Sequence, residues 1–379
     1  MDFRPQSIGR IEAIDLVRLV AMALMIEGHT LDALLDPQYR NDGWYHLWLF
    51  CRGFTAPTFM LLSGFSFAFA TIKRWEQNLS LNSVVLRRLR RFVFFILLGY
   101  VMHLPVHSLR TLGSVSQEQW RGWLQVDVLQ SIGVSLLLLQ FLVFVARTPA
   151  RFLKVSLGLS AGLVAVAPIA WAGGWGSHLP ALVGAYLDGS AGSLFPLLPW
   201  AAYTLFGAAL GCLYLGRSQR SPQSGLIFGR VMFLIGLAAM SIGFGLEQPA
   251  LAFFGPTVFW SASPTLFLIR AGFVLFLLGG MLLVHRFASF SSGTVRSLAQ
   301  ESLLVYFLHV VLLYGSIWNT GLRDYIAGLA PLQALGVAIL VGAGTMGMAL
   351  AWNRLKTQRP TPVLAFRTVV LAAAVISIL

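Results

Sequence analysis

The sequence has few charged residues, and acidic residues are the scarcest of them. Of the 379 residues, 11% are charged, with 14 acidic side chains against 27 basic ones, while 57% are hydrophobic. Soluble globular proteins carry roughly 25% charged residues, so this composition excludes a soluble globular protein. The polar connections between apolar runs reach only about 20 residues, which leaves no room for a soluble domain.

Motifs that mark several common enzyme classes are also absent. The chain has no CxxC spacing for a metal site. It has no Walker-type loop to support a nucleotide-binding fold. We expect no metal cofactor.

Long apolar runs recur along the whole chain and predict eleven membrane spans. Because backbone groups in lipid must bond internally and the alternation of barrel strands is absent, each span should be a helix of about 20 residues. In the sixth span, Gly207 and Gly211 are spaced for close packing against another helix. We expect an all-α polytopic membrane protein, with residues 1–379 forming one transmembrane domain. The predicted spans are 13–35, 52–72, 90–107, 125–146, 152–173, 196–215, 226–246, 264–284, 298–318, 332–352 and 363–379.

Basic residues are distributed unevenly over the connections between these spans. If the N-terminus is cytoplasmic, 20 of the 27 Lys and Arg residues fall on the inner side and 5 on the outer side, with Arg18 and Arg270 inside spans. This bias predicts a cytoplasmic N-terminus and an outer C-terminus. It explains the net charge of +13 without nucleic acid as a partner. Cys51 and Cys212 then lie near opposite faces, so no disulfide is expected.

The first span carries five ionisable residues inside an apolar run. Arg18 and His29 are eleven positions apart, which places them within ~20° of one helix face and roughly 16 Å apart along the axis. Asp15 stands three positions before Arg18 and Asp32 three after His29, so each pair can meet on that face. Glu27 points elsewhere.

This arrangement has a functional and a structural interpretation. A histidine oriented by an aspartate is the usual way to hold one tautomer as a general base, which favours His29 with Asp32 as a catalytic pair. The alternative is a salt-bridge network between helices, with His29 as a hydrogen-bonded core residue. Because two oriented pairs share one face, we prefer the functional interpretation.

An arginine run opens the third predicted span at the inner surface. It consists of Arg87, Arg88, Arg90 and Arg91. Such a run can meet anionic lipid head groups as a stop-transfer signal. Alternatively, its guanidinium groups can bind the phosphates of a cytosolic ligand.

Four further positions are candidates for the site. Arg270 is a lone cation in the eighth span, and it needs an anionic or carbonyl partner that is either structural or part of a substrate. His309 in the ninth span is either a packed core residue or a catalytic residue. His46 and Asp127 lie at outer helix ends, where solvated surface positions are common.

The opening motifs resemble those of the type-3 membrane acyltransferases. Arg18 and His29 form an R-x10-H pattern that Asp15 precedes. The stretch FMLLSGFSFAF follows at 59–69, in the second predicted span. Each motif is only moderately specific, and their order carries the resemblance.

Later stretches are more similar to the heparan-alpha-glucosaminide N-acetyltransferase family. They are DVLQSIGV at 127–134 and LFPLLPWAAYTLFGAALG at 194–211. SLLVYFLH at 302–309 resembles a segment near the C-terminus of both groups. With the eleven spans, the resemblance to this acyltransferase superfamily covers most of the chain.

The resemblance implies transfer of an acyl group, usually acetyl, from cytosolic acyl-CoA to an acceptor on the outer side. It implies that the arginine run meets the CoA phosphates, and that Arg18 and His29 border a channel for the thioester. In the heparan enzymes the position of His29 tends to be Asn, and the proposed catalytic histidine corresponds to His46. Both histidines are therefore candidates, and we prefer His29 because a carboxylate lies beside it.

The sequence thus predicts a membrane acyltransferase without a metal. His29, aided by Asp32, would deprotonate an amine or hydroxyl of a sugar or glycan, or would itself be acylated first. Arg52 or Arg270 could stabilise the oxyanion, with Asp127 and His309 as further substrate contacts. The aromatic side chains of 44–48 could stack on a sugar or form a membrane-interface belt.

Two other classes stay open at this stage. A transporter or channel would use the same intramembrane charges as a proton or anion pathway, although no inverted repeat is visible. A lipid-binding or glycan-binding protein without catalytic activity is the second alternative. For any of these we expect an integral protein of a bacterial inner membrane, in contact with lipid and compatible with a homo-oligomer.

Overall fold

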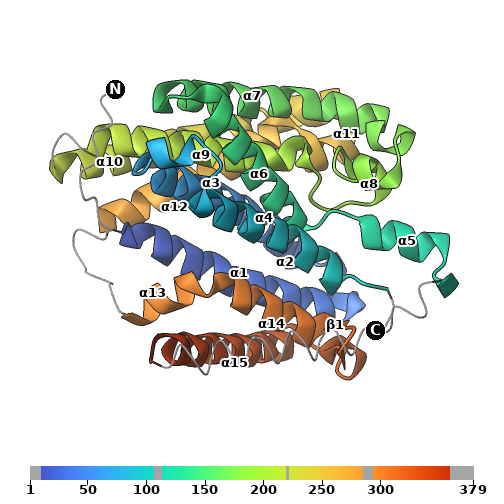
Figure 1. The fold of residues 1–379 in the computed structure, drawn as a ribbon. Coiled ribbons are helices and arrows are strands. Elements are labelled where there is room, and N and C mark those ends of the chain that lie inside the picture. The colour runs from blue at the N-terminus through green and yellow to red at the C-terminus, as the bar shows by residue number, and fades with distance from the viewer. Residues whose placement is uncertain (1–9, 106–112, 219–221, 285–292, 359–379) are drawn as a thin grey trace. The chain divides into compact units, whose positions relative to one another are not determined.

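The computed structural model describes residues 10–105, 113–218, 222–284 and 293–358 (Figure 1). These residues are almost entirely helical, apart from one short antiparallel pair of strands. The long helices are α1 (Glu12–Leu34), α3 (Thr55–Ile72), α4 (Ser83–Met102), α6 (Val128–Ala146), α7 (Pro149–Gly173), α9 (Leu197–Ser218), α10 (Pro222–Gly245), α11 (Glu247–Ala262), α12 (Pro264–Val284), α14 (Ser302–Tyr314) and α15 (Pro331–Gln358).

Shorter elements connect the long helices. The short α-helices are α2 (Gly43–Arg52), α5 (Gln117–Leu124), α8 (Ala181–Gly184) and α13 (Gly293–Gln300). The strands are β1 (Gly315–Ser316) and β2 (Asn319–Thr320). The 3-10 helices are η1 (Pro37–Asn41), η2 (Glu76–Asn78), η4 (Trp175–His178), η5 (Gly189–Ala191) and η6 (Leu322–Asp324).

Within the described ranges, seven helical segments are long and apolar enough to cross a membrane, or eight if the bent pair α13 and α14 counts as one span. These eight coincide with predicted spans. The first and third predicted spans form α1 and α4. These two helices carry too many charged residues to count among the eight. The last predicted span, 363–379, lies outside the described residues. The chain is an all-α polytopic membrane protein, and the number of eleven spans stays a prediction.

Large apolar side chains are exposed on several of these helices. On α10, Leu234 is 62% exposed, and on α15 Leu332 and Leu340 are 83% and 71% exposed. Helices whose outer faces are this apolar are expected to contact lipid rather than water.

Local capping signals explain where some helices begin, and one of them corrects a predicted boundary. Asn82 Oδ1 accepts hydrogen bonds from the backbone N–H groups of Val84 and Val85 at 2.9 and 3.1 Å, so α4 starts at Ser83 rather than near residue 90. The arginine run therefore lies in the second turn of α4 and just beyond it. Thr148 caps α7 in the same way, with Pro149 in its first turn.

Four helices lie in predicted connections: the short α2, α5 and α8, and the longer α11. Helix α2 falls in the predicted outer connection before the second span, and its ten residues are too few to have been detected as a span. Helix α11 lies between the predicted seventh and eighth spans and is interrupted at Gly255, where φ is +75° and Pro256 follows. A Gly-Pro pair predicts a break in secondary structure, so neither half of α11 was recognised as helical from the sequence.

By its internal contacts the chain divides into two compact units. Unit 1 comprises Met1–Ile14, Ala56–Val101 and Leu124–Ser289, and unit 2 comprises Asp15–Thr55, Met102–Trp123 and Phe290–Leu379. The prediction of one transmembrane domain over the whole chain stays a prediction.

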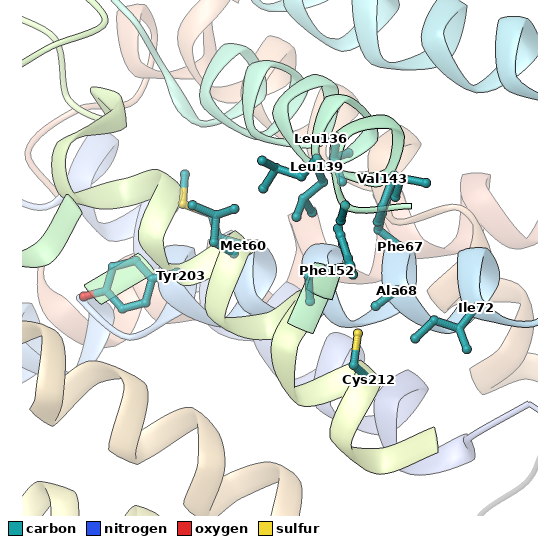
Figure 2. Packing of buried hydrophobic residues seen from close by; sticks show 14 of the residues in the cluster. Met60, Phe67, Ala68, Ile72, Leu136, Leu139, Val143, Phe152, Tyr203 and Cys212 are labelled. Carbon is teal, nitrogen blue, oxygen red and sulfur yellow. The ribbon is translucent and has the colours of Figure 1, made fainter. Parts of the chain in front are cut away.

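The core of unit 1 is formed by side chains from α3, α6, α7 and α9. Figure 2 shows Met60, Phe67, Leu139, Phe152 and Cys212 from these helices packed around one another. Met60, Leu139, Phe152 and Cys212 have no exposed surface. This continuous apolar packing fixes the four helices relative to one another within the unit.

Helix α9 approaches α3 closely at its two glycines, as their spacing predicted. A Cβ atom added to Gly207 would lie 2.0 Å from the Leu61 carbonyl oxygen, and one added to Gly211 would lie 2.8 Å from that of Phe65. Only glycine permits backbones to come this close. The predicted packing role of Gly207 and Gly211 is confirmed.

Unit 2 places α1, α14 and α15 next to one another (Figure 1). Leu31 of α1 packs with Ala334 and Ala338 of α15, and Trp48 of α2 borders this cluster. At the start of α14, the Glu301 carboxylate accepts a hydrogen bond from Asn353 Nδ2 at 2.8 Å and pairs with Lys356 of α15. These contacts hold α14 in place for the polar groups that it carries.

Candidate active site

Two histidines from distant parts of the sequence meet in unit 2. His29 Nδ1 on α1 lies 2.8 Å from His309 Nε2 on α14, and the two rings are nearly parallel, at 10° with centroids 5.0 Å apart. His309 has no exposed surface. Its Nδ1 lies 2.8 Å from the Val305 carbonyl oxygen, one turn earlier on α14. A continuous line of hydrogen bonds therefore runs from the α14 backbone to the ring of His29.

One turn beyond His29 on α1, Asp32 binds a cation and a hydroxyl. Its Oδ1 accepts a hydrogen bond from Arg52 Nη1 of α2 at 2.9 Å, and its Oδ2 accepts one from the Tyr314 hydroxyl at 3.1 Å. The Tyr314 hydroxyl also lies 3.2 Å from the His29 carbonyl oxygen, and its ring packs edge to face with the imidazole of His29. A carboxylate, a guanidinium and a phenol thus lie beside the histidine pair.

Aromatic and acidic groups hold the Arg52 side chain on its other side. The guanidinium carbon lies 5.5 Å from the centre of the Trp48 ring, and Trp48 Nε1 donates to Glu27 Oε1 at 2.7 Å. Arg52 passes closely over Gly28, because a Cβ atom there would lie 3.3 Å from its Cγ and Cδ atoms. Glu27 thus orients Trp48, whose ring contacts Arg52.

The C-terminal end of α1 is fixed by backbone contacts. Arg40 Nη2 donates to the carbonyl oxygens of Asp32 and Leu35 at 3.0 and 3.2 Å, which satisfies carbonyl groups that the helix leaves unpaired. Leu35 pairs in a single parallel bridge with Leu329. The turn of α1 that carries Asp32 is therefore held at a defined position in unit 2.

Arg18 occupies the other half of α1. It forms an ion pair with Asp15 at 4.0 Å, as their spacing predicted. Since α1 runs without interruption from Glu12 to Leu34, Arg18 and His29 lie along one continuous helix, roughly 16 Å apart at 1.5 Å per residue.

His46 is placed differently from His29. It lies on α2 with an exposed side chain, and its ring packs against Tyr45 with centroids 6.2 Å apart. His29 is therefore half-buried and hydrogen-bonded, whereas the side chain of His46 is exposed.

The arginine run belongs to unit 1, and its four members have two different environments. Arg88 donates from Nη2 to Thr71 Oγ1 at 2.8 Å, bonds the buried Asn78 Oδ1, and lies 4.5 Å from the centre of the Phe67 ring. The other three are exposed: Arg87, Arg90 and Arg91. Arg88 therefore holds unit 1 together, and the exposed three can meet an external anion.

A lysine lies close in sequence to the partners of Arg88. Lys73 Nζ lies 3.8 Å from the centre of the Phe69 ring, just after the end of α3. Burial lowers the pKa of the Lys73 ammonium below its ordinary value, because the charged form loses hydration.

The two remaining candidates also lie in unit 1. Asp127 caps α6, where its Oδ1 accepts from the backbone N–H of Val128 at 2.6 Å. Arg270 on α12 lies 5.4 Å from the centre of the Trp200 ring and interacts with the Tyr203 hydroxyl. Both contacts are consistent with structural roles, and no described contact of Arg270 is a carboxylate.

Of the predicted site residues, His29, Asp32, Arg52 and His309 are brought together in unit 2. The sequence interpretation missed Tyr314, which joins them from the last residue of α14. A signal was available, because α14 is almost entirely apolar and its few polar side chains include Tyr306, His309 and Tyr314. The structure also gives Asp32 the partners Arg52 and Tyr314, whereas the spacing on α1 had paired it with His29.

Fold and site together define an integral membrane protein with a cluster of hydrogen-bonded polar side chains among the helices of unit 2. The model of the family described as heparan-alpha-glucosaminide N-acetyltransferase, catalytic, matches residues 10–249, which is more than half of the chain. The chain belongs to this family, which confirms the resemblance seen in its motifs and makes it a membrane acetyltransferase. No curated protein matches the sequence. The matched region includes His29, Asp32 and Arg52, whereas His309 and Tyr314 lie beyond it.

Proposed function

We propose that this protein transfers an acetyl group from cytosolic acetyl-CoA to an amine or hydroxyl of a sugar or glycan on the outer face of the membrane. The observation that supports it best is the environment of His29, whose ring is hydrogen-bonded to His309 beside the Asp32–Arg52 ion pair. In a chain of this acetyltransferase family, such an imidazole suits a general base.

The proposed reaction needs one proton acceptor and no metal. The lone pair of the acceptor O–H or N–H group attacks the carbonyl carbon of the thioester, while His29 takes its proton. The tetrahedral intermediate then collapses as the C–S bond breaks, and the CoA sulfur receives the proton from the His29 imidazolium. The products are the acetyl ester or amide and CoA with a free thiol.

Arg52 is the residue of this centre that can stabilise the oxyanion. Its guanidinium group has five N–H donors, of which the bond to Asp32 uses one. The Asp32 carboxylate and the Trp48 ring hold it in one orientation, and donors positioned in advance stabilise developing charge best. Arg270 stays the second candidate for this role.

For the donor, we propose that Arg87, Arg90 and Arg91 bind the CoA phosphates. Guanidinium groups match phosphate oxygens in geometry and charge, and these three side chains are exposed. Arg88 is left out of direct phosphate binding in this proposal because it is half-buried and two of its donors bond Thr71 and Asn78.

For the acceptor, Trp44 is the aromatic residue best suited to stack on a sugar ring. It is 39% exposed, and its Nε1 bonds Asp42 Oδ2 at 3.1 Å, which fixes the ring. Tyr45 is buried, and Trp48 is engaged by Glu27 and Arg52.

The proposal is tested with the purified full-length protein in lipid nanodiscs. Radiolabelled acetyl-CoA is incubated with a panel of aminosugars and glycans, and labelled product is separated from the donor. We expect transfer to at least one acceptor, with His46→Ala retaining it. Absence of both CoA binding and acetyl transfer in the wild type would overturn the proposal, and loss of transfer in His46→Ala but not in His29→Ala would move the base to His46.

A further inference from the structure

The proton positions on the two histidines follow from their hydrogen bonds, starting at the backbone of α14. The Val305 carbonyl oxygen can only accept a hydrogen bond, and it lies 2.8 Å from His309 Nδ1. His309 Nδ1 must therefore carry a hydrogen.

The charge of His309 follows from its burial. Its side chain is 0% exposed. In the part of the chain that the structure describes, its hydrogen-bond and ring partners are the His29 ring, the Val305 carbonyl group, and the backbone and ring of Tyr306, and none of these carries a negative charge. A buried imidazolium without a counter-charge is costly, so His309 is neutral. A neutral imidazole with its hydrogen on Nδ1 has a lone pair on Nε2.

This lone pair determines the position of the hydrogen on His29. His309 Nε2 lies 2.8 Å from His29 Nδ1, and a hydrogen bond between them needs one donor. Since His309 Nε2 is the acceptor, His29 Nδ1 is the donor and carries the hydrogen. The lone pair of neutral His29 is then on Nε2.

We infer that His309 is a positioning residue, which holds His29 in the tautomer that presents the Nε2 lone pair to the acceptor substrate. This inference rests on the proposed function, and it names the nitrogen of His29 that acts as the base. In the opposite tautomer Nε2 carries the hydrogen, so it could not accept a proton. In this chain His309 thus performs on His29 Nδ1 the orienting role that carboxylates perform in other enzymes, while Asp32 binds Arg52 and Tyr314.

The tautomer can be measured without any enzymatic activity. The full-length protein, labelled with 15N in its seven histidines, is studied by two-bond 1H–15N correlation spectroscopy in nanodiscs at about pH 8.5, well above the ordinary histidine pKa. His29→Gln removes and thereby assigns the signal of His29. We expect a protonated Nδ1 and an unprotonated Nε2 in the wild type. A His29 signal with hydrogen on Nε2 would overturn the inference, even in a protein that transfers acetyl groups.

Two substitutions of His309 separate the hydrogen bond from packing. His309→Gln places a side-chain oxygen near the position of Nε2, where it can accept from His29 Nδ1. His309→Asn is shorter and cannot reach that position. We expect His309→Gln to keep the tautomer and to lower kcat no more than roughly threefold, whereas His309→Asn should mix the tautomers and lower kcat about 100-fold.

The matched control is His178→Asn, which alters an exposed histidine of η4 outside this centre and should leave kcat unchanged. Equal losses in His309→Gln and His309→Asn, with the His29 tautomer unchanged in both, would contradict the inference. If His309→Asn does not fold, the His29 tautomer measured in the wild type still tests the inference. Absence of acetyl transfer in the wild type would instead count against the proposed function alone.

Discussion

The guanidinium of Arg52 on α2 lies 2.9 Å from the carboxylate of Asp32 on α1, one turn beyond His29. The two side chains keep 26% and 37% of their surface exposed, so the ion pair is partly solvated. A pair of this kind contributes little to stability, typically about 0–1 kcal/mol. Loss of this ion pair alone is therefore expected to cost little unfolding free energy.

Replacement of Arg52 should affect turnover far more than folding. In Arg52→Met we expect kcat to fall about 100-fold or more, as when an oxyanion donor is removed, because the substitution deletes all five donors and keeps much of the side-chain length. The thermal unfolding temperature should change little. Steady-state acetyl transfer and unfolding of the same preparation measure the two effects, and an unchanged kcat would assign oxyanion stabilisation elsewhere, with Arg270 as the next candidate.

The arginines of α4 should divide into a structural and a binding class. Arg88→Ala leaves Thr71 and the buried Asn78 without their guanidinium partner, and it should destabilise the protein by about 1–3 kcal/mol. The triple variant Arg87→Ala, Arg90→Ala and Arg91→Ala should unfold like the wild type and bind CoA more weakly. Thermal unfolding and calorimetric CoA titration distinguish them, and wild-type CoA affinity in the triple variant would contradict the proposed phosphate site.

Close packing of α9 on α3 gives a prediction that is independent of function. Gly207→Ala forces a Cβ atom against the Leu61 carbonyl oxygen, and it should cost about 1–3 kcal/mol of unfolding free energy. The control is Gly158→Ala on α7, where an added Cβ meets no atom within 4 Å and should change stability by less than about 1 kcal/mol. Denaturant unfolding in detergent measures both, and equal stability of the two variants would contradict the observed helix contact.

The sequence predicted most helices but not the partners of the site residues. Apolar runs of about 20 residues are a strong signal, and every predicted span within the described residues coincides with helix. Helical periodicity also placed Asp15 beside Arg18, because both lie on one helix. Helix α2 was missed because a run of ten residues is too short to indicate a span.

The pairing of His29 with His309 lay beyond such reasoning. Periodicity gives the face of one helix on which a residue lies, but it does not say which helix packs against that face, and these two histidines are 280 positions apart. For Asp32, local spacing favoured His29, whereas the structure shows a charge-assisted bond to Arg52, twenty positions along the chain. A guanidinium–carboxylate bond is stronger than most neutral hydrogen bonds, so a partner from another helix can displace the local one.

The role of His29 as the base of acetyl transfer can be tested by comparing three forms of the protein. Initial rates of radiolabelled acetyl transfer are measured for the wild type, His29→Ala and the exposed control His178→Ala, each with its CoA affinity determined in parallel. We expect His29→Ala to lose about 10²–10⁴-fold in rate, the usual contribution of a general base, while its CoA affinity stays near that of the wild type and His178→Ala is fully active. Transfer by His29→Ala at the wild-type rate would contradict it.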